Sequence, residues 1–117
     1  MRPSVLIVDD HAAFRSAARE LLTAEGYAVV GEAADGASAL EAVRELRPDV
    51  VLLDVQLPDL NGFDVAELLA KEETMPVVVF ISSRGLSSVR WRLAANPGWR
   101  FIAKSDLSGE VLAAALA

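Results

Sequence analysis

Short aliphatic runs recur along this chain and alternate with stretches of helical periodicity. The clearest runs are residues 5–8, 50–53 and 77–81, which contain only Val, Leu, Ile and Phe. Runs of four or five apolar residues, rich in β-branched side chains, are typical of strands that are buried on both faces of a parallel sheet. This pattern limits what the chain can fold into more than any other feature.

The intervals between the runs carry apolar residues at helical spacing, with charged residues between them. Phe14, Ala17, Leu21 and Leu22, for example, are expected to share one helix face. Asp106 or Ser108 is the expected N-cap of the last helix. The predicted order is strand 5–8, helix 11–25, strand 27–30, helix 39–46, strand 50–54, helix 63–69, strand 77–81, helix 86–95, strand 101–103 and helix 109–116.

Five successive strand–helix units predict an α/β fold. Right-handed crossovers place helices on both faces of a doubly wound, five-stranded parallel sheet, for which we expect the flavodoxin-like strand order 2-1-3-4-5. The length of 117 residues fits one core, and the sequence has no internal linker or repeat. We therefore expect residues 1–117 to form a single domain.

Charge and composition argue against several classes of function. The formal net charge of −6 disfavours binding of nucleic acid or anionic membrane by this domain alone. The absence of cysteine excludes disulfides and thiolate metal sites, as is typical of a reducing cytoplasm. No apolar run is long enough to form a signal-peptide core or to span a bilayer. We expect a cytoplasmic protein without a membrane partner.

Polar side chains follow four of the predicted strands at the point where each strand ends. Asp9 and Asp10 follow the first strand, and Asp54 ends the third. Ser82 follows the fourth strand and Lys104 the fifth. Ligands bind at the carboxyl ends of strands in open parallel sheets, so we expect these side chains to meet there. Because an isolated buried charge is costly, we also expect Asp54 to leave the core.

Three carboxylates close together cannot all stay ionised without a counterion. Mg²⁺ prefers oxygen ligands and binds one or two carboxylates together with a phosphate. A carboxylate can then act as a nucleophile and form an aspartyl-phosphate, while a lysine and a hydroxyl stabilise the transferred group. Each residue alone has an ordinary reading as a cap, a turn residue or a solvated charge, and only their convergence favours phosphoryl chemistry.

With these residues the chain resembles the response-regulator receiver domains of two-component signalling, from about Val5 to the C-terminus. Each motif is weak alone, but the four in this order and spacing are specific. They are Val8-Asp9-Asp10, Leu53-Asp54 followed by Pro58 and Gly62, Ile81-Ser82-Ser83, and Phe101-Ile102-Ala103-Lys104.

The resemblance implies roles around a phosphoryl group. Asp54 would be its acceptor, Ser82 would donate a hydrogen bond to it, and Lys104 would pair with it. Phe101 would be the switch aromatic, whose ring turns inward when Ser82 moves toward the phosphoryl group. In this family the donor is a histidine kinase or a small molecule such as acetyl phosphate, and the domain only assists its own phosphorylation and dephosphorylation.

The resemblance also implies a magnesium site. Asp10, Asp54 and the backbone carbonyl of Gln56 would ligate Mg²⁺, with Asp9 acting mainly through water. His11, the only histidine, is expected at the pocket rim or in solvent, so the chain has no obvious phosphohistidine of its own. Gln56 and Arg84, two residues beyond Asp54 and Ser82, would tune hydrolysis.

Trp91, Trp99 and Phe101 fall where the family has its output and dimer face, although buried packing is an equal alternative for the two tryptophans. The start Val8-Asp9-Asp10-His11 and the ending Lys104-Ser105 look most like those of receivers attached to a C-terminal helix-turn-helix output, which suggests a role in transcription regulation. No such segment follows here, so we expect either a truncated receiver or a natural stand-alone one. Ser105 replaces the proline that often follows the lysine, which leaves the conformation of the Lys104-Ser105 link open.

Three alternatives remain at this stage. A dehalogenase-type phosphatase also uses a strand-end aspartate, but it has Asp-x-Asp where this chain has Gln56 at the second position. A flavin carrier would need a hydroxyl- and glycine-rich phosphate loop after the first strand, where Asp9 and Asp10 would repel phosphate. The third alternative is a binding module on the same fold that is never phosphorylated. Such a module would not need Asp9, Asp10 and Asp54 together, so their presence argues against it.

Overall fold

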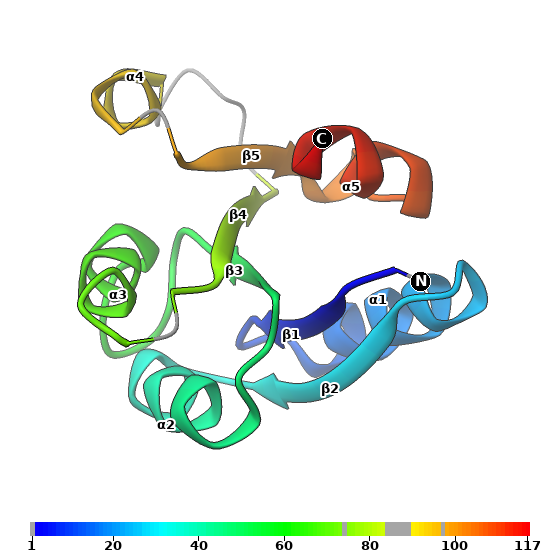
Figure 1. The fold of residues 1–117 in the computed structure, drawn as a ribbon, viewed down its shortest axis with the longest axis horizontal. Coiled ribbons are helices and arrows are strands. Elements are labelled where there is room, and N and C mark those ends of the chain that lie inside the picture. Colours follow the sequence, from blue (N-terminus) through cyan, green and yellow to red (C-terminus); the bar gives the residue numbers. More distant parts are fainter. Residues whose placement is uncertain (1, 74, 84–89, 97) are drawn as a thin grey trace.

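The computed structural model describes residues 2–73, 75–83, 90–96 and 98–117. Across these residues, the strands form one parallel sheet in the predicted order β2-β1-β3-β4-β5 (Figure 1). The elements are β1 (Ser4–Val8), α1 (Ala12–Ala24), β2 (Ala28–Ala33), α2 (Gly36–Leu46), β3 (Val50–Asp54), α3 (Gly62–Leu69), β4 (Val77–Ser82), α4 (Arg90–Ala95), β5 (Arg100–Ala103), a 3-10 turn (Lys104–Asp106) and α5 (Gly109–Leu116).

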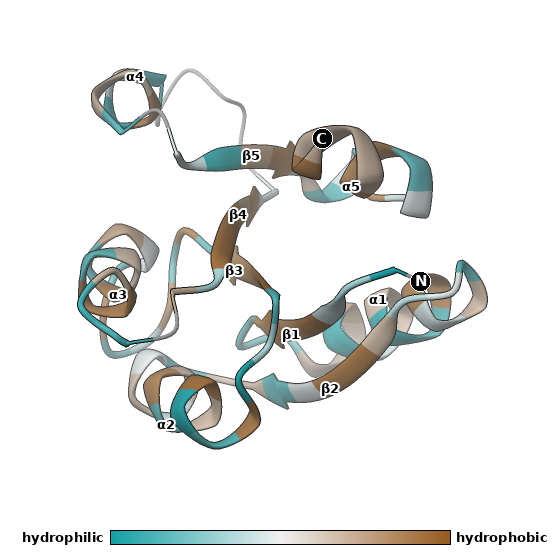
Figure 2. Cartoon of the chain, viewed as in Figure 1, coloured by the Kyte–Doolittle hydropathy of each residue, from teal (hydrophilic) through white to brown (hydrophobic). Residues whose placement is uncertain are grey.

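Helices cover both faces of the sheet, as the alternating pattern predicts (Figure 1). Helices α1 and α5 pack on one face, and α2 and α3 pack on the other. Successive residues of β1 point to opposite layers, with Leu6 facing α2 and α3 and Ile7 facing α1 and α5, and both are fully buried. Burial on both faces is why the central runs are continuously apolar, and Figure 2 shows these strands as the hydrophobic centre of the fold.

Helix α2 begins at Gly36, three residues before the predicted start, with Asp35 as its N-cap rather than part of a separate turn. Two larger differences concern β2 and α1. Strand β2 continues to Ala33 rather than ending at Val30, because it lies at the edge of the sheet, where exposed residues such as Glu32 are tolerated. In α1 the predicted face was partly wrong, since Leu21 is 36% exposed and Ala18 is buried instead. The buried line of α1 runs through Ala18 and Leu22, which are one turn apart.

The C-terminal part agrees with the prediction where it is described. Helix α5 has the predicted bounds, and the N-cap is Ser108, whose hydroxyl accepts the Val111 N–H at 3.0 Å. The fourth helix is described from Arg90 onward, so residues 86–89 of the predicted 86–95 helix lie outside the described residues. Among the helices of the described parts, none has the length and apolarity required to cross a membrane.

Candidate functional site

The parallel strands deliver the candidate residues to one end of the sheet. Asp54 and Ser82 are the last residues of β3 and β4, while Asp10 and Lys104 come just after β1 and β5. These four side chains line a cleft of about 190 Å³, together with Gln56 and other residues of the loop after β3. Asp9 lies behind them and is fully buried. Side chains up to 95 positions apart in the chain thus share one site because every strand points its carboxyl end the same way.

Asp54 leaves the apolar core as expected, since it ends β3 and lines the cleft, but it remains largely inaccessible to solvent. Its residue exposure is 6%, and that of Asp9 is 0%. The Nζ atom of Lys104 lies 2.5 Å from Oδ2 of Asp9 and 3.1 Å from Oδ2 of Asp54. A carboxylate can be buried where an opposite charge and further hydrogen bonds compensate for its lost hydration, and Lys104 supplies that charge to both.

The pairing leaves the two buried carboxylates unequal. Burial raises the pKa of the Asp54 carboxyl, and the nearby Asp9 charge acts in the same direction against the Gln56 N–H and Lys104. Burial also disfavours ionised Asp9, but hydrogen bonds from Lys104 and from the His11 N–H hold its pKa below the usual value. The pKa of Lys104 is raised, because its two carboxylate partners outweigh burial. Of the two buried carboxylates, Asp54 is therefore the one whose negative charge is compensated less.

The loop after β3 folds back over Asp54. The Gly62 N–H donates to the Val55 carbonyl at 2.7 Å, and Gln56 pairs with Asn61 in an isolated bridge. A Cβ atom at Gly62 would lie 2.3 Å from the backbone oxygen of Asp54, so only glycine permits this approach. As a result the Gln56 N–H donates to Oδ1 of Asp54 at 3.0 Å, which fixes the orientation of the carboxylate.

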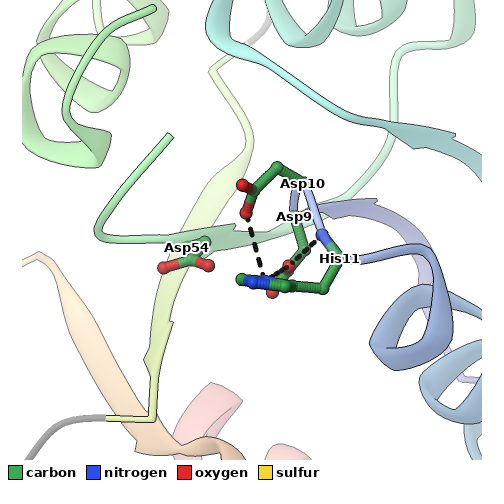
Figure 3. Close-up of side chains that lie close together, drawn as sticks. All are labelled: Asp9, Asp10, His11 and Asp54. Atoms are coloured by element: carbon green, nitrogen blue, oxygen red, sulfur yellow. Dashed lines mark hydrogen bonds and ion pairs between the residues drawn. The ribbon is translucent and has the colours of Figure 1, made fainter. Parts of the chain in front are cut away.

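His11 lies at the rim of the cleft, as predicted, and it also contacts two of the acidic residues. Its side chain is 68% exposed and lines the cleft, while Nδ1 lies 3.0 Å from Oδ1 of Asp9 and 3.2 Å from Oδ1 of Asp10 (Figure 3). The backbone N–H of His11 also donates to Oδ1 of Asp9 at 2.8 Å. The signal in the sequence was its place directly after the acidic pair, at the N-cap of α1.

Two residues of α1 near the site were missed by the sequence analysis. The ring of Phe14 lies under Lys104, with Nζ 4.6 Å from the ring centroid. Arg15 donates from Nη1 to the backbone carbonyl of Asp9 at 2.6 Å and pairs through Nε with Glu32. Because α1 starts just after Asp10, its first turn lies beside the carboxyl edge of the sheet. This is the only sequence signal that could have placed Phe14 and Arg15 near the site.

The donor set suits a divalent cation. Ligand atoms of Asp9, Asp10, His11 and Asp54 all lie within 4.8 Å of one another (Figure 3). Carboxylate oxygens are the ligands that Mg²⁺ prefers, and the raised pKa of Asp54 marks negative charge that a cation would neutralise. The residues present therefore fit Mg²⁺ on both chemical and electrostatic grounds.

Among the described residues, the predicted aromatic side chains belong to a separate part of the structure from the cleft. Trp99 packs against Phe63 and Phe80, with ring centroids 5.8 and 5.1 Å away, whereas Trp91 is 66% exposed. Phe101 is half-buried and packs against the layer under α2 and α3. The two tryptophans thus divide between packing and exposure. Arg84 lies outside the described residues, and the Lys104-Ser105 peptide bond is trans.

Comparison with known proteins gives consistent matches. Residues 5–116 match the model of the family described as response regulator receiver domain. The DNA-binding response regulator MtrA of Mycobacterium tuberculosis is 47% identical over 81 residues, covering 68% of this chain but only 34% of MtrA. Chemotaxis protein CheY of Thermotoga maritima is 38% identical over 85 residues, covering 73% of this chain and 71% of CheY. The solved receiver domain of the putative response regulator NarL from Mycobacterium tuberculosis superposes with a TM-score of 0.82 at 32% identity, covering 99% and 98% of the two chains.

Proposed function

Because this chain belongs to the response-regulator receiver domain family, we propose that it accepts a phosphoryl group on Asp54 and thereby switches a partner or an output domain. The observation that carries this proposal is the buried Asp54 carboxylate at the end of β3, which faces the cleft beside Lys104. Its raised pKa favours neutralisation of its charge, whether by a cation, by a proton or by esterification.

In the proposed reaction a carboxylate oxygen of Asp54 attacks phosphorus, and the bond from phosphorus to the donor breaks as the leaving group takes its electron pair. The Gln56 N–H holds Oδ1, so the carboxylate is oriented before the donor arrives. Lys104 stays protonated beside it and stabilises the charge of the transferred group. The hydroxyl of Ser82, at the end of the neighbouring strand β4, donates a hydrogen bond to a phosphoryl oxygen.

Asp10, Asp54 and the Gln56 carbonyl would hold Mg²⁺, with Asp9 acting through water. Bound there, the ion would neutralise phosphoryl oxygens and offset the repulsion between the acidic residues. Asp9 keeps a second task, because it pairs with Lys104 and so fixes the ammonium next to Asp54.

The phosphoryl donor in this proposal is the phosphohistidine of a histidine kinase, or a small acyl phosphate. The output follows from movement of Ser82 and of the half-buried Phe101 ring toward the new charge. The exposed Trp91 on α4 then belongs to the face that contacts a second copy or an output domain. The domain assists only its own phosphorylation and dephosphorylation, since Gln56 stands where a phosphatase of the Asp-x-Asp type has its second aspartate.

The test is incubation of the protein with Mg²⁺ and acetyl phosphate, followed by intact mass measurement. One phosphoryl group should be added, and the addition should disappear in Asp54→Asn and with EDTA. Asp64→Asn is the matched control, because Asp64 is exposed in the first turn of α3. An adduct that survives Asp54→Asn would contradict the proposal, and so would steady release of phosphate from a phosphoester substrate.

A second variant separates phosphorylation from its consequence. Lys104→Ala should keep some phosphorylation on Asp54 but lose the conformational response. Tryptophan fluorescence or amide chemical shifts around Phe101 report this response. A normal response in the phosphorylated Lys104→Ala protein would contradict the role of Lys104.

A further inference from the structure

The two buried aspartates already use their oxygens on protein partners. Oδ1 of Asp9 accepts the His11 N–H at 2.8 Å, and its Oδ2 pairs with Lys104 at 2.5 Å. Asp54 has the same arrangement, with the Gln56 N–H on Oδ1 and Lys104 on Oδ2. The ligand groups that are most open to the cleft are therefore those of Asp10 and His11, whose side chains are 38% and 68% exposed.

The imidazole of His11 is largely exposed, but its Nδ1 atom faces the acidic groups. A single ring nitrogen, Nδ1, lies within 3.0 to 3.2 Å of one oxygen of Asp9 and one of Asp10 (Figure 3). A neutral imidazole has one nitrogen with a proton and one with a lone pair, and the lone pair is a good metal ligand. Nδ1 shares the 4.8 Å cluster with the carboxylate oxygens, so one cation can reach both kinds of donor.

We propose that His11 supplies a nitrogen ligand to the divalent-cation site, so that the site selects borderline metals such as Ni²⁺, Co²⁺ and Zn²⁺ over Mg²⁺. The inference rests on the proposed function, because it concerns the same site. Imidazole binds these metals well, and their affinity for such sites follows the Irving–Williams order. Mg²⁺ prefers oxygen and retains its water, so it gains little from the imidazole.

The alternative is that His11 is only a hydrogen-bond donor that holds Asp9 and Asp10 in place. The two roles predict different selectivities. A donor that positions carboxylates supports every cation alike, whereas a nitrogen ligand supports the borderline metals alone. The ratio of the Ni²⁺ and Mg²⁺ affinities therefore separates the two roles, even if both affinities fall.

The experiment is calorimetric titration of the tag-free protein with Ni²⁺ and, separately, with Mg²⁺ at one pH. His11→Asn keeps an amide donor but removes the imidazole, and the exposed position makes the change tolerable for folding. We expect the Ni²⁺ affinity to fall at least about tenfold and the Mg²⁺ affinity to change less than about twofold. Asp10→Asn is the control and should weaken both metals.

A second readout uses the fact that His11 is the only histidine and that the chain has no cysteine. The imidazole signals of the wild-type protein in a nitrogen-15 spectrum then belong to one residue. Zn²⁺ should shift the Nδ1 resonance strongly, and Mg²⁺ should not. Two results would refute the proposal that His11 is a ligand: equal losses of Ni²⁺ and Mg²⁺ affinity in His11→Asn, or an Nδ1 resonance that Zn²⁺ does not shift. Either result would leave the proposed function intact. Metal binding that is indifferent to both Asp10→Asn and Asp54→Asn would instead overturn the proposed function.

Discussion

The two ends of the sheet differ in what they bury. At the carboxyl end lie Asp9, Asp54 and Ser82, which are the buried polar and charged side chains of the described residues, around a cleft of about 190 Å³. Near the amino ends of β4 and β5 lies a larger cavity of about 370 Å³, lined mainly by apolar side chains such as Met75 and Trp99. The candidate chemistry is in the smaller space, so cavity size is a poor guide to the site in this fold.

The difference shows how each end is stabilised. The carboxyl end buries charge only because Lys104 arrives from another strand to compensate for Asp9 and Asp54. The cavity instead borders on aromatic packing, in which Trp99, just before β5, contacts Phe63 of α3 and Phe80 of β4. Removing a charge should therefore disturb both stability and ligand binding at the first end, whereas truncating an aromatic residue at the second should reduce stability alone.

The largest effect is expected from Lys104→Met, which leaves two buried carboxylates without their cation. Breaking a buried ion pair costs about 4 kcal/mol, measured by urea unfolding in metal-free buffer, and Mg²⁺ should recover part of it. The control is Arg44→Met, because the Arg44–Glu72 pair is largely exposed on the Arg44 side and is worth about 0.5 kcal/mol. Similar losses in the two variants would refute the proposed dependence of the buried charges on Lys104.

Trp99→Ala should come next, with a loss of about 3 kcal/mol in unfolding free energy and an unchanged Mg²⁺ affinity. Trp99 lies just before β5, at the end of the sheet away from the cleft, and packs against the rings of Phe63 and Phe80. Trp91→Ala is the matched control, since Trp91 is 66% exposed, and should change stability by about 0.5 kcal/mol or less. A weakened metal site in Trp99→Ala would show that the two ends are coupled.

Gly62→Ala should cost about 2 kcal/mol through overpacking and should also weaken Mg²⁺ binding. The new methyl group would lie 2.3 Å from the Asp54 backbone oxygen, so the loop carrying Gln56 must shift. Gly98→Ala is the control, because a Cβ atom there meets no heavy atom within 4 Å. Unfolding curves and calorimetry measure the two effects, and a Gly62→Ala protein with normal metal binding would mean that the loop position does not matter.

Asp54→Asn should have the smallest effect and the opposite sign, a gain of about 1 kcal/mol in metal-free buffer at neutral pH. The folded-state pKa of Asp54 lies above its ordinary value of 3.8, so folded protein holds the proton more tightly than unfolded protein does. Ionised Asp54 therefore destabilises the fold as pH rises through that raised pKa, and the gain in Asp54→Asn should vanish below pH 3.8.

Asp9→Asn supplies the contrast in the same pH series. The folded-state pKa of Asp9 is lowered, so its ionised form stabilises the fold above the unfolded pKa, and this contribution is lost as pH falls. Asp9→Asn should therefore destabilise the protein at neutral pH. If Asp9→Asn and Asp54→Asn both lower the unfolding free energy at neutral pH, the pKa values of the two carboxyl groups are not shifted in opposite directions.

Much of the fold could be read from the sequence because its strands are continuous aliphatic runs. The bounds of β3 and α5 were predicted without error, whereas β2 was cut short because Gly31 and Glu32 interrupt its apolar pattern. The phase of α1 was also misjudged, since Ala17 and Ala18 have the same hydrophobicity and only packing distinguishes them. Edge strands and alanine-rich helices carry too weak a local signal to fix such details.

The sequence by itself determined that Asp10, Asp54, Ser82 and Lys104 would meet, because parallel strands joined by right-handed crossovers end at one edge. Only the tertiary structure decided how they share their charges. Asp9 and Asp10 are neighbours in the chain, yet one is fully buried against Lys104 and the other faces the cleft. Burial and pairing depend on groups that lie as many as 95 positions away, and no local pattern encodes that distance in space.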